Sequence, residues 1–346
     1  MYSGGMGTPK RVALAIVLGL LVVGCSSDDK KPTGSGGSSS GGSGGSSGGS
    51  GGSGGIKWKA AVGEQGVFVQ TFDEQSWQER NLVDQNLYSV TCVGNEHGWA
   101  AGESGTVVHS SDYGQTWAEQ SSGVSQTLRS VHFAHGSSAL IGIAAGDAGT
   151  LIRSNDGGAT WLAVDTKTTS DLHGTAAGLG GKLLVAVGDA ATVILSRDAG
   201  ESWEASTVSG ALDLAAVAMD ANAVQILTVD DAGHVFASTD KGMSFQLETT
   251  LAGALNAVSV GPDGQAALIA GDGGTAYTRT APGNWQQVTT ATDKNLYAAL
   301  ISHDGSDSYL AGQSGALLQS KNGAAFSQVA VTTDLDLFGL EDLDPH

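Results

Sequence analysis

The sequence predicts an all-β fold, a seven-bladed β-propeller whose ring is closed by a C-terminal strand that completes the first blade. Three observations predict it: an internal repeat, two residue markers that run through this repeat in phase, and a spare copy of one marker near the C-terminal end. The repeat contains short apolar, β-branched runs and no helical stripe, which matches four short strands per unit.

The first marker is an aromatic residue that recurs at intervals of 40 to 44 residues. Its copies are Trp77, Trp117, Trp161, Trp203, Phe245, Trp285 and Phe326. A glycine-rich turn and an apolar run precede each copy, as expected where two strands of one blade are joined by a tight hairpin. Seven copies at this interval predict seven blades.

The second marker is a leucine that opens a short apolar run, at intervals of 41 to 44 residues. Its copies are Leu87, Leu128, Leu172, Leu214, Leu255, Leu296 and Leu337. The first leucine follows the first aromatic marker, so the first blade lacks an inner strand at its N-terminal side. The copy at Leu337 is therefore expected to complete that blade and to leave no open sheet edge at the seam.

The hairpin before the aromatic marker has its own pattern, clearest in Ser110 to Trp117, which reads S-S-D-Y-G-Q-T-W. Its carboxylate can accept hydrogen bonds from loop N–H groups, and its glycine permits a positive φ. The pattern resembles the Asp-box, or BNR repeat, of propellers. The aspartates Asp112, Asp156, Asp198 and Asp240 are therefore expected to be structural rather than catalytic.

The whole repeat, most complete from Asn86 to Trp117, resembles the photosystem II stability/assembly factor-like family of seven-bladed propellers over about residues 56–343. The resemblance implies a propeller that binds protein partners, in photosynthetic members partly through a basic patch. In this chain the five arginines of the repeat region fall at unrelated repeat positions. They are Arg80, Arg129, Arg153, Arg197 and Arg279.

The N-terminal 25 residues predict a lipoprotein signal peptide. Lys10 and Arg11 precede an apolar run over residues 12–23, which is too short to span a bilayer. The run ends in Leu21-Val22-Val23-Gly24-Cys25, which resembles the lipobox of bacterial lipoproteins. In such proteins the cysteine carries the lipid, so Cys25 is the expected lipidation site.

Residues 26–55 predict a flexible tether, because they are almost entirely glycine and serine after residue 32. The propeller then occupies residues 56–346. We expect a monomer held at the cell envelope through its lipid anchor only. Ser26, directly after the cysteine, favours the outer membrane over the inner one in a cell that has two.

Composition excludes some functions. The formal net charge of −19 argues against nucleic acid, whose phosphates require lysine and arginine. Cys92 lies in a strand-like run and is expected to be a buried, inert thiol. His132 and His135 stand without matching ligands nearby, and we interpret them as surface residues. The sequence predicts no metal, no cofactor and no catalytic residue.

One surface is built by all seven repeats together. In a propeller, the inner strand starts at one mouth of the central channel, so the residue after each marker leucine should ring that mouth. The residue type at this position varies between repeats, while the flanking positions repeat. The seven residues are Tyr88, Arg129, His173, Ala215, Asn256, Tyr297 and Phe338.

The turns between the second and third strands open on the same face and should add a ring of acids. The residues are Glu64, Glu103, Asp147, Asp189, Asp231 and Asp272, with Gln313 in the seventh turn. Two interpretations stay open for these acids, a negative binding face or the plain suitability of Asp and Glu for glycine-flanked turns.

Together these features favour a membrane-tethered, non-catalytic binding or assembly module that recognises an envelope protein or glycan at the channel mouth. One alternative is a glycoside hydrolase or lyase, because Asp-box propellers include glycosidases. A second alternative is a structural or adhesive cell-surface protein without a discrete site.

Overall fold

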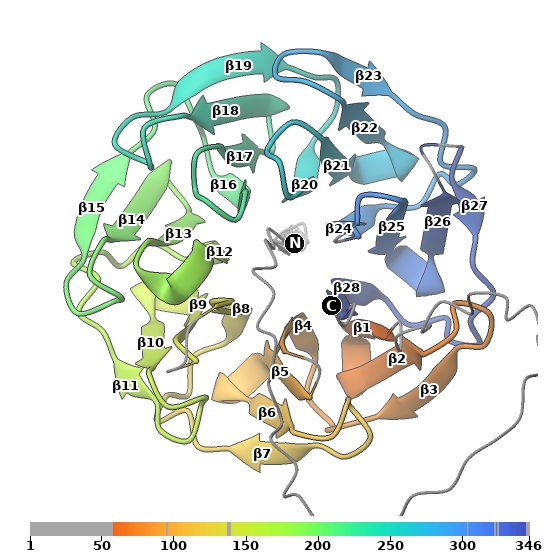
Figure 1. The fold of residues 1–346 in the computed structure, drawn as a ribbon, viewed down its shortest axis with the longest axis horizontal. Helices are drawn as coiled ribbons and strands as arrows, with labels where there is room; N and C mark the ends of the chain where they lie inside the picture. The colour runs from red at the N-terminus through yellow and green to blue at the C-terminus, as the bar shows by residue number, and fades with distance from the viewer. Residues whose placement is uncertain are drawn as a thin grey trace, which may run out of the picture.

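The computed structural model describes residues 58–343, apart from residues 95, 137–139, 303, 322 and 324. The described strands form seven four-stranded antiparallel sheets arranged as a ring (Figure 1). The predicted seven-bladed, all-β fold is therefore confirmed. Cys25, the predicted signal peptide and the predicted tether lie outside the described residues.

Each blade runs from an inner strand at the channel to an outer strand at the rim (Figure 1). The first blade contains β28 (Leu337–Leu343), β1 (Trp58–Gly63), β2 (Val67–Thr71) and β3 (Gln78–Asn81). The second contains β4 (Leu87–Val93), β5 (His97–Gly102), β6 (Val107–Ser110) and β7 (Ala118–Gln120). The third contains β8 (Leu128–Phe133), β9 (Gly142–Gly146), β10 (Leu151–Ser154) and β11 (Leu162–Ala163). The fourth contains β12 (Leu172–Ala177), β13 (Leu184–Gly188), β14 (Thr192–Ser196) and β15 (Glu204–Thr207).

The remaining blades follow the same order. The fifth contains β16 (Leu214–Met219), β17 (Ile226–Asp230), β18 (His234–Ser238) and β19 (Gln246–Thr250). The sixth contains β20 (Leu255–Val260), β21 (Ala267–Gly271), β22 (Ala276–Arg279) and β23 (Trp285–Gln287). The seventh contains β24 (Leu296–Ile301), β25 (Asp307–Gly312), β26 (Leu317–Lys321) and β27 (Ser327–Gln328). Short 3₁₀ turns occur at η1 (Glu64–Gly66), η2 (Glu103–Gly105), η3 (Asp147–Gly149), η4 (Leu179–Gly181), η5 (Asp272–Gly274) and η6 (Gln313–Gly315).

The core lies between neighbouring blades, because each sheet packs both faces against the sheets beside it. The inner strand β4 is buried along its whole length, whereas the outer strand β15 is exposed. The inner strands also contact one another around the channel, from β28 through β4 to β24 and back to β28. Between the second and third blades, Trp99 stacks on Phe133 with ring centroids 3.7 Å apart.

The seam of the ring is closed as predicted, by β28 pairing with β1. Lys59 on β1 is buried there, and its Nζ lies 2.8 Å from Asp342 Oδ1 and 3.3 Å from a Glu74 carboxylate oxygen. Burial alone would lower the pKa of Lys59, but the Asp342 and Glu74 carboxylates outweigh it and the pKa is raised. Burial raises the pKa of the neighbouring Glu341 well above its ordinary value.

The Asp-box aspartates have the structural role that the sequence predicts. Asp112 accepts hydrogen bonds from Thr116 N at 2.8 Å and from Thr116 Oγ1 at 2.6 Å. The shortened box of the first blade keeps this device, because Asp73 accepts from Ser76 N at 2.8 Å. The same kind of hydroxyl and backbone donors lower the pKa of Asp198 to about 2.

Four of the five arginines join neighbouring blades, although their repeat positions differ. Arg80 donates to the Gly114 carbonyl oxygen, Arg153 to that of Ala199 at 2.5 Å, and Arg197 to that of Lys241 at 2.9 Å. Arg279 of the sixth blade pairs with Glu248 of the fifth at 2.8 Å. These side chains are engaged in holding the ring together.

The histidine interpretation is corrected for His132. His132 belongs to β8 and is only 4% exposed, and burial lowers the pKa of its imidazole to about 4. The inner strand lies between two neighbouring blades, so side chains on both of its faces pack against protein. In a single exposed sheet, one of these faces would contact water. Cys92 is buried, as predicted, and burial raises the pKa of its thiol.

Within residues 58–343, where described, no cluster of three or more His, Cys, Asp or Glu side chains is arranged to hold a metal ion. Nor does this part of the chain contain a helix with the length and apolar character needed to cross a membrane.

Candidate functional site

The predicted mouth residues share one backbone feature that sequence reasoning missed: each sits at a β-bulge. In the second blade the register shifts between Leu87 and Ser89, so Tyr88 is the extra residue in β4. Equivalent shifts follow the marker leucine in the other six blades and involve Arg129, His173, Ala215, Asn256, Tyr297 and Phe338. A bulge re-aims a side chain and ends regular pairing. The seven side chains, which are of six types, thus occupy one repeated position at the same end of the channel.

The glycine that precedes every turn acid except Asp231 sets up this geometry. In the second blade, Gly102 pairs with Leu87, and a Cβ on Gly102 would lie 2.0 Å from the Asn86 carbonyl oxygen. Only glycine permits so close an approach. The next residue, Glu103, then donates its N–H to that same oxygen at 3.0 Å. The turn acid therefore lies beside the start of the inner strand.

Four blades join the bulged residue to the turn acid through their side chains. The Tyr88 hydroxyl donates to Glu103 Oε1 at 3.0 Å, and Asn256 Nδ2 donates to Asp272 Oδ1 at 2.9 Å. Arg129 Nε lies 2.5 Å from Asp147 Oδ1, and His173 Nε2 lies 2.6 Å from Asp189 Oδ1. The structure therefore brings eight of the predicted site residues together in pairs. We call the bulged residues and the turn acids together the channel mouth.

The aromatic side of the channel mouth is formed by Tyr88, Tyr297 and Phe338. Phe338 lies between the two tyrosines, with ring centroids 5.3 Å from Tyr88 and 5.7 Å from Tyr297. Tyr88 and Phe338 are only 6% and 7% exposed, because the bulge turns them against each other. Burial raises the pKa of Tyr88 to about 12, and the nearby Glu103 carboxylate acts in the same direction. The Tyr88 hydroxyl therefore keeps its proton and donates it in the hydrogen bond to Glu103.

The remaining predicted residues are not joined to each other in this way. Glu64 accepts from Asp336 N at 3.2 Å, beside Phe338 in the first blade. In the fifth blade, Asp230 replaces the usual glycine and is fully buried, accepting hydrogen bonds from Leu212 N and His234 N. Asp231 is exposed next to it, and Ala215 offers no polar group.

A second set of mouth residues was missed, namely those directly before the marker leucine. Their side chains accept the central N–H of the preceding blade's turn, so they connect blades around the mouth. The acceptors are Asn86, Asp171, Asp213, Asn295 and Asp336, at 2.7 to 2.9 Å. The recurrence of Asn or Asp before leucine is the signal that could have found them.

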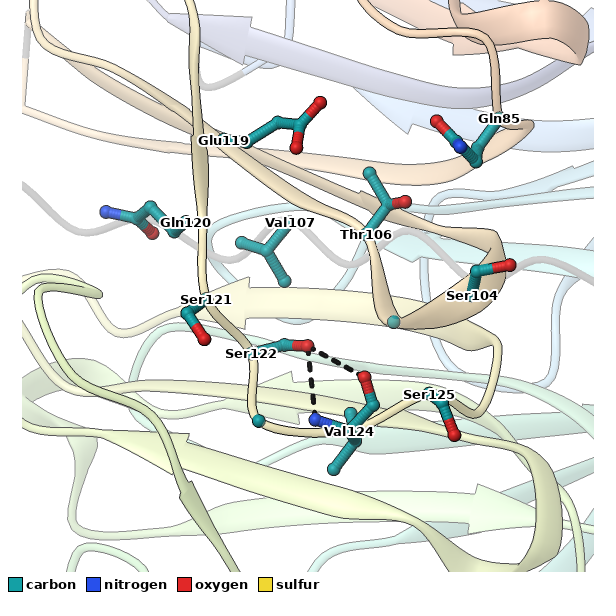
Figure 2. A pocket seen from close by; sticks show the side chains of 12 residues that line it. Gln85, Ser104, Thr106, Val107, Glu119, Gln120, Ser121, Ser122, Val124 and Ser125 are labelled. Carbon is teal, nitrogen blue, oxygen red and sulfur yellow. Dashed lines mark hydrogen bonds between the residues drawn. The ribbon is translucent and has the colours of Figure 1, made fainter.

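A polar hollow of about 530 Å³ lies beside η2, lined by residues such as Gln85, Ser104 and Glu119 (Figure 2). The Ser122 hydroxyl lies at its base and bonds to both the N–H and the carbonyl oxygen of Val124 (Figure 2). A similar hollow of about 440 Å³ recurs in the sixth blade, between Gly274 and residues 287–292. Because the feature recurs with the repeat, we assign it to blade geometry.

Comparisons with known proteins agree with the sequence resemblance. A family profile described as photosynthesis system II assembly factor YCF48 matches residues 118–286. A structure of YCF48 bound to D1 peptide has a TM-score of 0.58 at 17% identity, covering 74% of this chain and 92% of its own. YCF48 from Cyanidioschyzon merolae has a TM-score of 0.61 at 17% identity, covering 76% and 90%. The chain is a seven-bladed propeller that resembles the photosystem II assembly factors.

The propeller shares its fold with an enzyme as well. An ancestral GH74 enzyme has a TM-score of 0.57 at 18% identity, with 75% of this chain and 38% of the enzyme covered. Among curated proteins, none matches the sequence. The likeness to all three structures concerns the fold, so the side chains of the channel mouth must carry the argument about function.

Proposed function

We propose that this propeller is a non-catalytic binding or assembly module, held at the cell envelope by a lipid on Cys25, that grips a protein segment at its channel mouth. The observation that carries the proposal is the contrast at the bulges. The bulge itself repeats in all seven blades, whereas the residue placed there differs in nearly every one. A repeated frame that presents different side chains at one end is suited to recognition.

Two further points support this proposal. A protein of the same fold, YCF48, has been seen with a peptide bound. In addition, the aromatic residues and hydrogen-bonded carboxylates of the channel mouth are held by their neighbours, so little side-chain entropy is lost when a partner binds.

The proposal predicts that the triple variant Tyr88→Ala, Tyr297→Ala, Phe338→Ala loses its partner. Aromatic residues at the centre of a protein interface carry a large share of binding energy, so recovery should fall about tenfold or more. The measurement is a pull-down from envelope extract with the full chain as bait, followed by mass spectrometry. Circular dichroism shows whether the triple variant is folded. If it is not, the single variant Tyr297→Ser is tested in its place, because Tyr297 is the least buried of the three aromatic residues.

The matched control removes apolar side chains elsewhere. Met243 and Leu247 are 71% and 54% exposed in the fifth blade, away from the bulges, and Met243→Ala with Leu247→Ala should leave recovery unchanged. A partner that both variants retain would remove the channel mouth from the proposal. Loss of the partner in both would indicate a diffuse adhesive surface instead.

The anchor is part of the same proposal. The lipobox-like residues up to Cys25 support it, and Ser26 favours the outer membrane. Cell fractionation of Cys25→Ser should move the protein from the membrane pellet to the supernatant. A variant that stays in the pellet would exclude lipidation of Cys25 as the attachment.

A glycoside hydrolase is the second candidate, favoured by the GH74 likeness alone. It would need two carboxyl groups set across a substrate cleft. Hydrolysis of a polysaccharide by the full chain would replace the proposal made here.

A further inference from the structure

Resting on the proposed function, we propose that the channel mouth recognises a cationic peptide segment, with a lysine or arginine entering between the turn acids and the aromatic rings. Three observations point to the same chemistry: an excess of carboxylates, a buried acceptor without a donor, and an aromatic wall.

The carboxylates far outnumber the cations at this end of the channel. Besides the six turn acids, three aspartates precede a marker leucine and bond to the turns, namely Asp171, Asp213 and Asp336. Among the described residues at these positions, Arg129 is engaged with Asp147, and Lys294 donates to the Ser314 carbonyl oxygen at 2.8 Å. A surface that carries an excess of one sign of charge attracts ligands of the opposite charge.

The acceptor without a donor is His173 Nδ1. His173 is 8% exposed, and its Nδ1 is buried without a hydrogen-bond partner among the described residues. Its Nε2 faces the Asp189 carboxylate at 2.6 Å, and a carboxylate only accepts. In the neutral imidazole the proton therefore lies on Nε2, and Nδ1 needs a donor. Because Nδ1 is covered in the free protein, a ligand that carries N–H groups reaches it only when the His173 ring shifts.

In the aromatic wall of Tyr88, Phe338 and Tyr297, the Tyr297 ring suits the same ligand, because it is less buried than Tyr88 and Phe338, which are 6% and 7% exposed. Aromatic faces attract ammonium and guanidinium groups and cover the aliphatic stem behind them. The hydroxyl of Tyr88 is directed to Glu103 at 3.0 Å, so this acid is held next to the wall. A guanidinium group can stack on a ring while donating to a carboxylate, which makes arginine the better fit of the two cations.

A neutral glycan could also stack on these rings, but it would leave the carboxylate excess uncompensated. The two ligands differ in their response to salt. Binding of a cationic peptide should weaken as ionic strength rises, because the attraction between charges is screened. Binding of a neutral sugar should not.

The test measures fluorescence anisotropy of the full-length protein with labelled glycine–serine peptides. One peptide carries two arginines, a second carries citrulline at the same positions, and a third carries glutamate. We expect only the arginine peptide to bind. Its affinity should fall when the salt concentration is raised from about 50 to about 300 mM, because salt screens the attraction between surface charges. Binding of the glutamate or citrulline peptide as tightly as the arginine peptide would overturn the inference, and so would binding of a neutral oligosaccharide in its place.

Matched charge variants locate the site. Asp189→Asn with Asp272→Asn should weaken the arginine peptide about tenfold, since each change removes one charge and keeps an acceptor. Glu119→Gln with Glu204→Gln changes the net charge equally on exposed outer strands and should have no effect. Equal weakening in both pairs would mean attraction by bulk charge and would overturn the inference.

The outcome is separable from that of the proposed function. If the arginine peptide fails to bind while the envelope partner is still lost in the Tyr88, Tyr297 and Phe338 variant, the channel mouth binds a different class of ligand. If both fail, the channel mouth is not a binding face at all.

Discussion

Deletion of residues 337–343 is expected to abolish cooperative folding of the propeller. The deletion removes the inner strand of the first blade and leaves β1 with an unpaired edge at the channel. Leu337, Phe338 and Leu340 are all more than nine-tenths buried. Losing three such side chains costs about 5–9 kcal/mol, which is comparable to the whole stability of a typical domain. Differential scanning calorimetry should show no single sharp transition.

A circular permutant provides the control. Leu343 pairs with Trp58, so the end of β28 lies beside the start of β1. A chain that begins at Asp334, passes through Leu343 and a short glycine-containing turn into Trp58, and ends at Thr333 keeps every strand. It should unfold in one transition near the wild-type temperature. If the deletion variant also unfolds in this way, β28 is dispensable and the seam does not hold the ring.

Replacement of Lys59 by methionine is expected to destabilise the ring by about 3–5 kcal/mol, because it leaves the Asp342 carboxylate buried without its cation. The Asp342 side chain is fully buried beside Lys59. For a domain of this size, the loss corresponds to a fall of about 10 °C in Tm. Since the pKa of Lys59 is raised in the folded protein, its contribution is fully present below pH 10.5, the ordinary value for lysine, and is lost as the pH rises through the folded-state pKa. Thermal unfolding followed by circular dichroism at pH 7 measures the effect.

The control is Lys321→Met at the same seam. Lys321 reaches Glu74 at 3.6 Å, but its side chain is 56% exposed, so the change should cost less than about 1 kcal/mol. Combining Lys59→Met with Asp342→Leu should recover much of the lost stability, because the fully buried Asp342 carboxylate is then no longer left without its cation. A single Lys59→Met variant as stable as Lys321→Met would show that the buried pair contributes little.

The repeat itself made most of the fold predictable. The aromatic and leucine markers are set by packing between blades, and packing repeats with the blade, so blade number and ring closure follow from spacing. The position of the mouth residues follows as well, because Tyr88 and its equivalents keep a fixed place after the marker leucine. The role of the Asp-box aspartates was predictable because it depends on contacts within one loop.

Features that depend on contacts between strands or blades were not predictable. The bulge at Tyr88 is a shift in pairing, which no single strand reveals. The burial of His132 and the engagement of Arg153 with Ala199 depend on the adjacent blade. The substitution of Asp230 for glycine is visible in the sequence, but its buried hydrogen bonds require the fold.

The late position of β28 in the chain has a consequence for biogenesis. A ribosome delivers the first blade's outer strands at the beginning and its inner strand only after the other six blades have been made. Asp336 and Phe338, which belong to the channel mouth, arrive with that last strand. A chain that stops just before β28 therefore has six complete blades, an open ring and an unfinished channel mouth. If the channel mouth binds a partner as proposed, the ability to bind it coincides with completion of the ring.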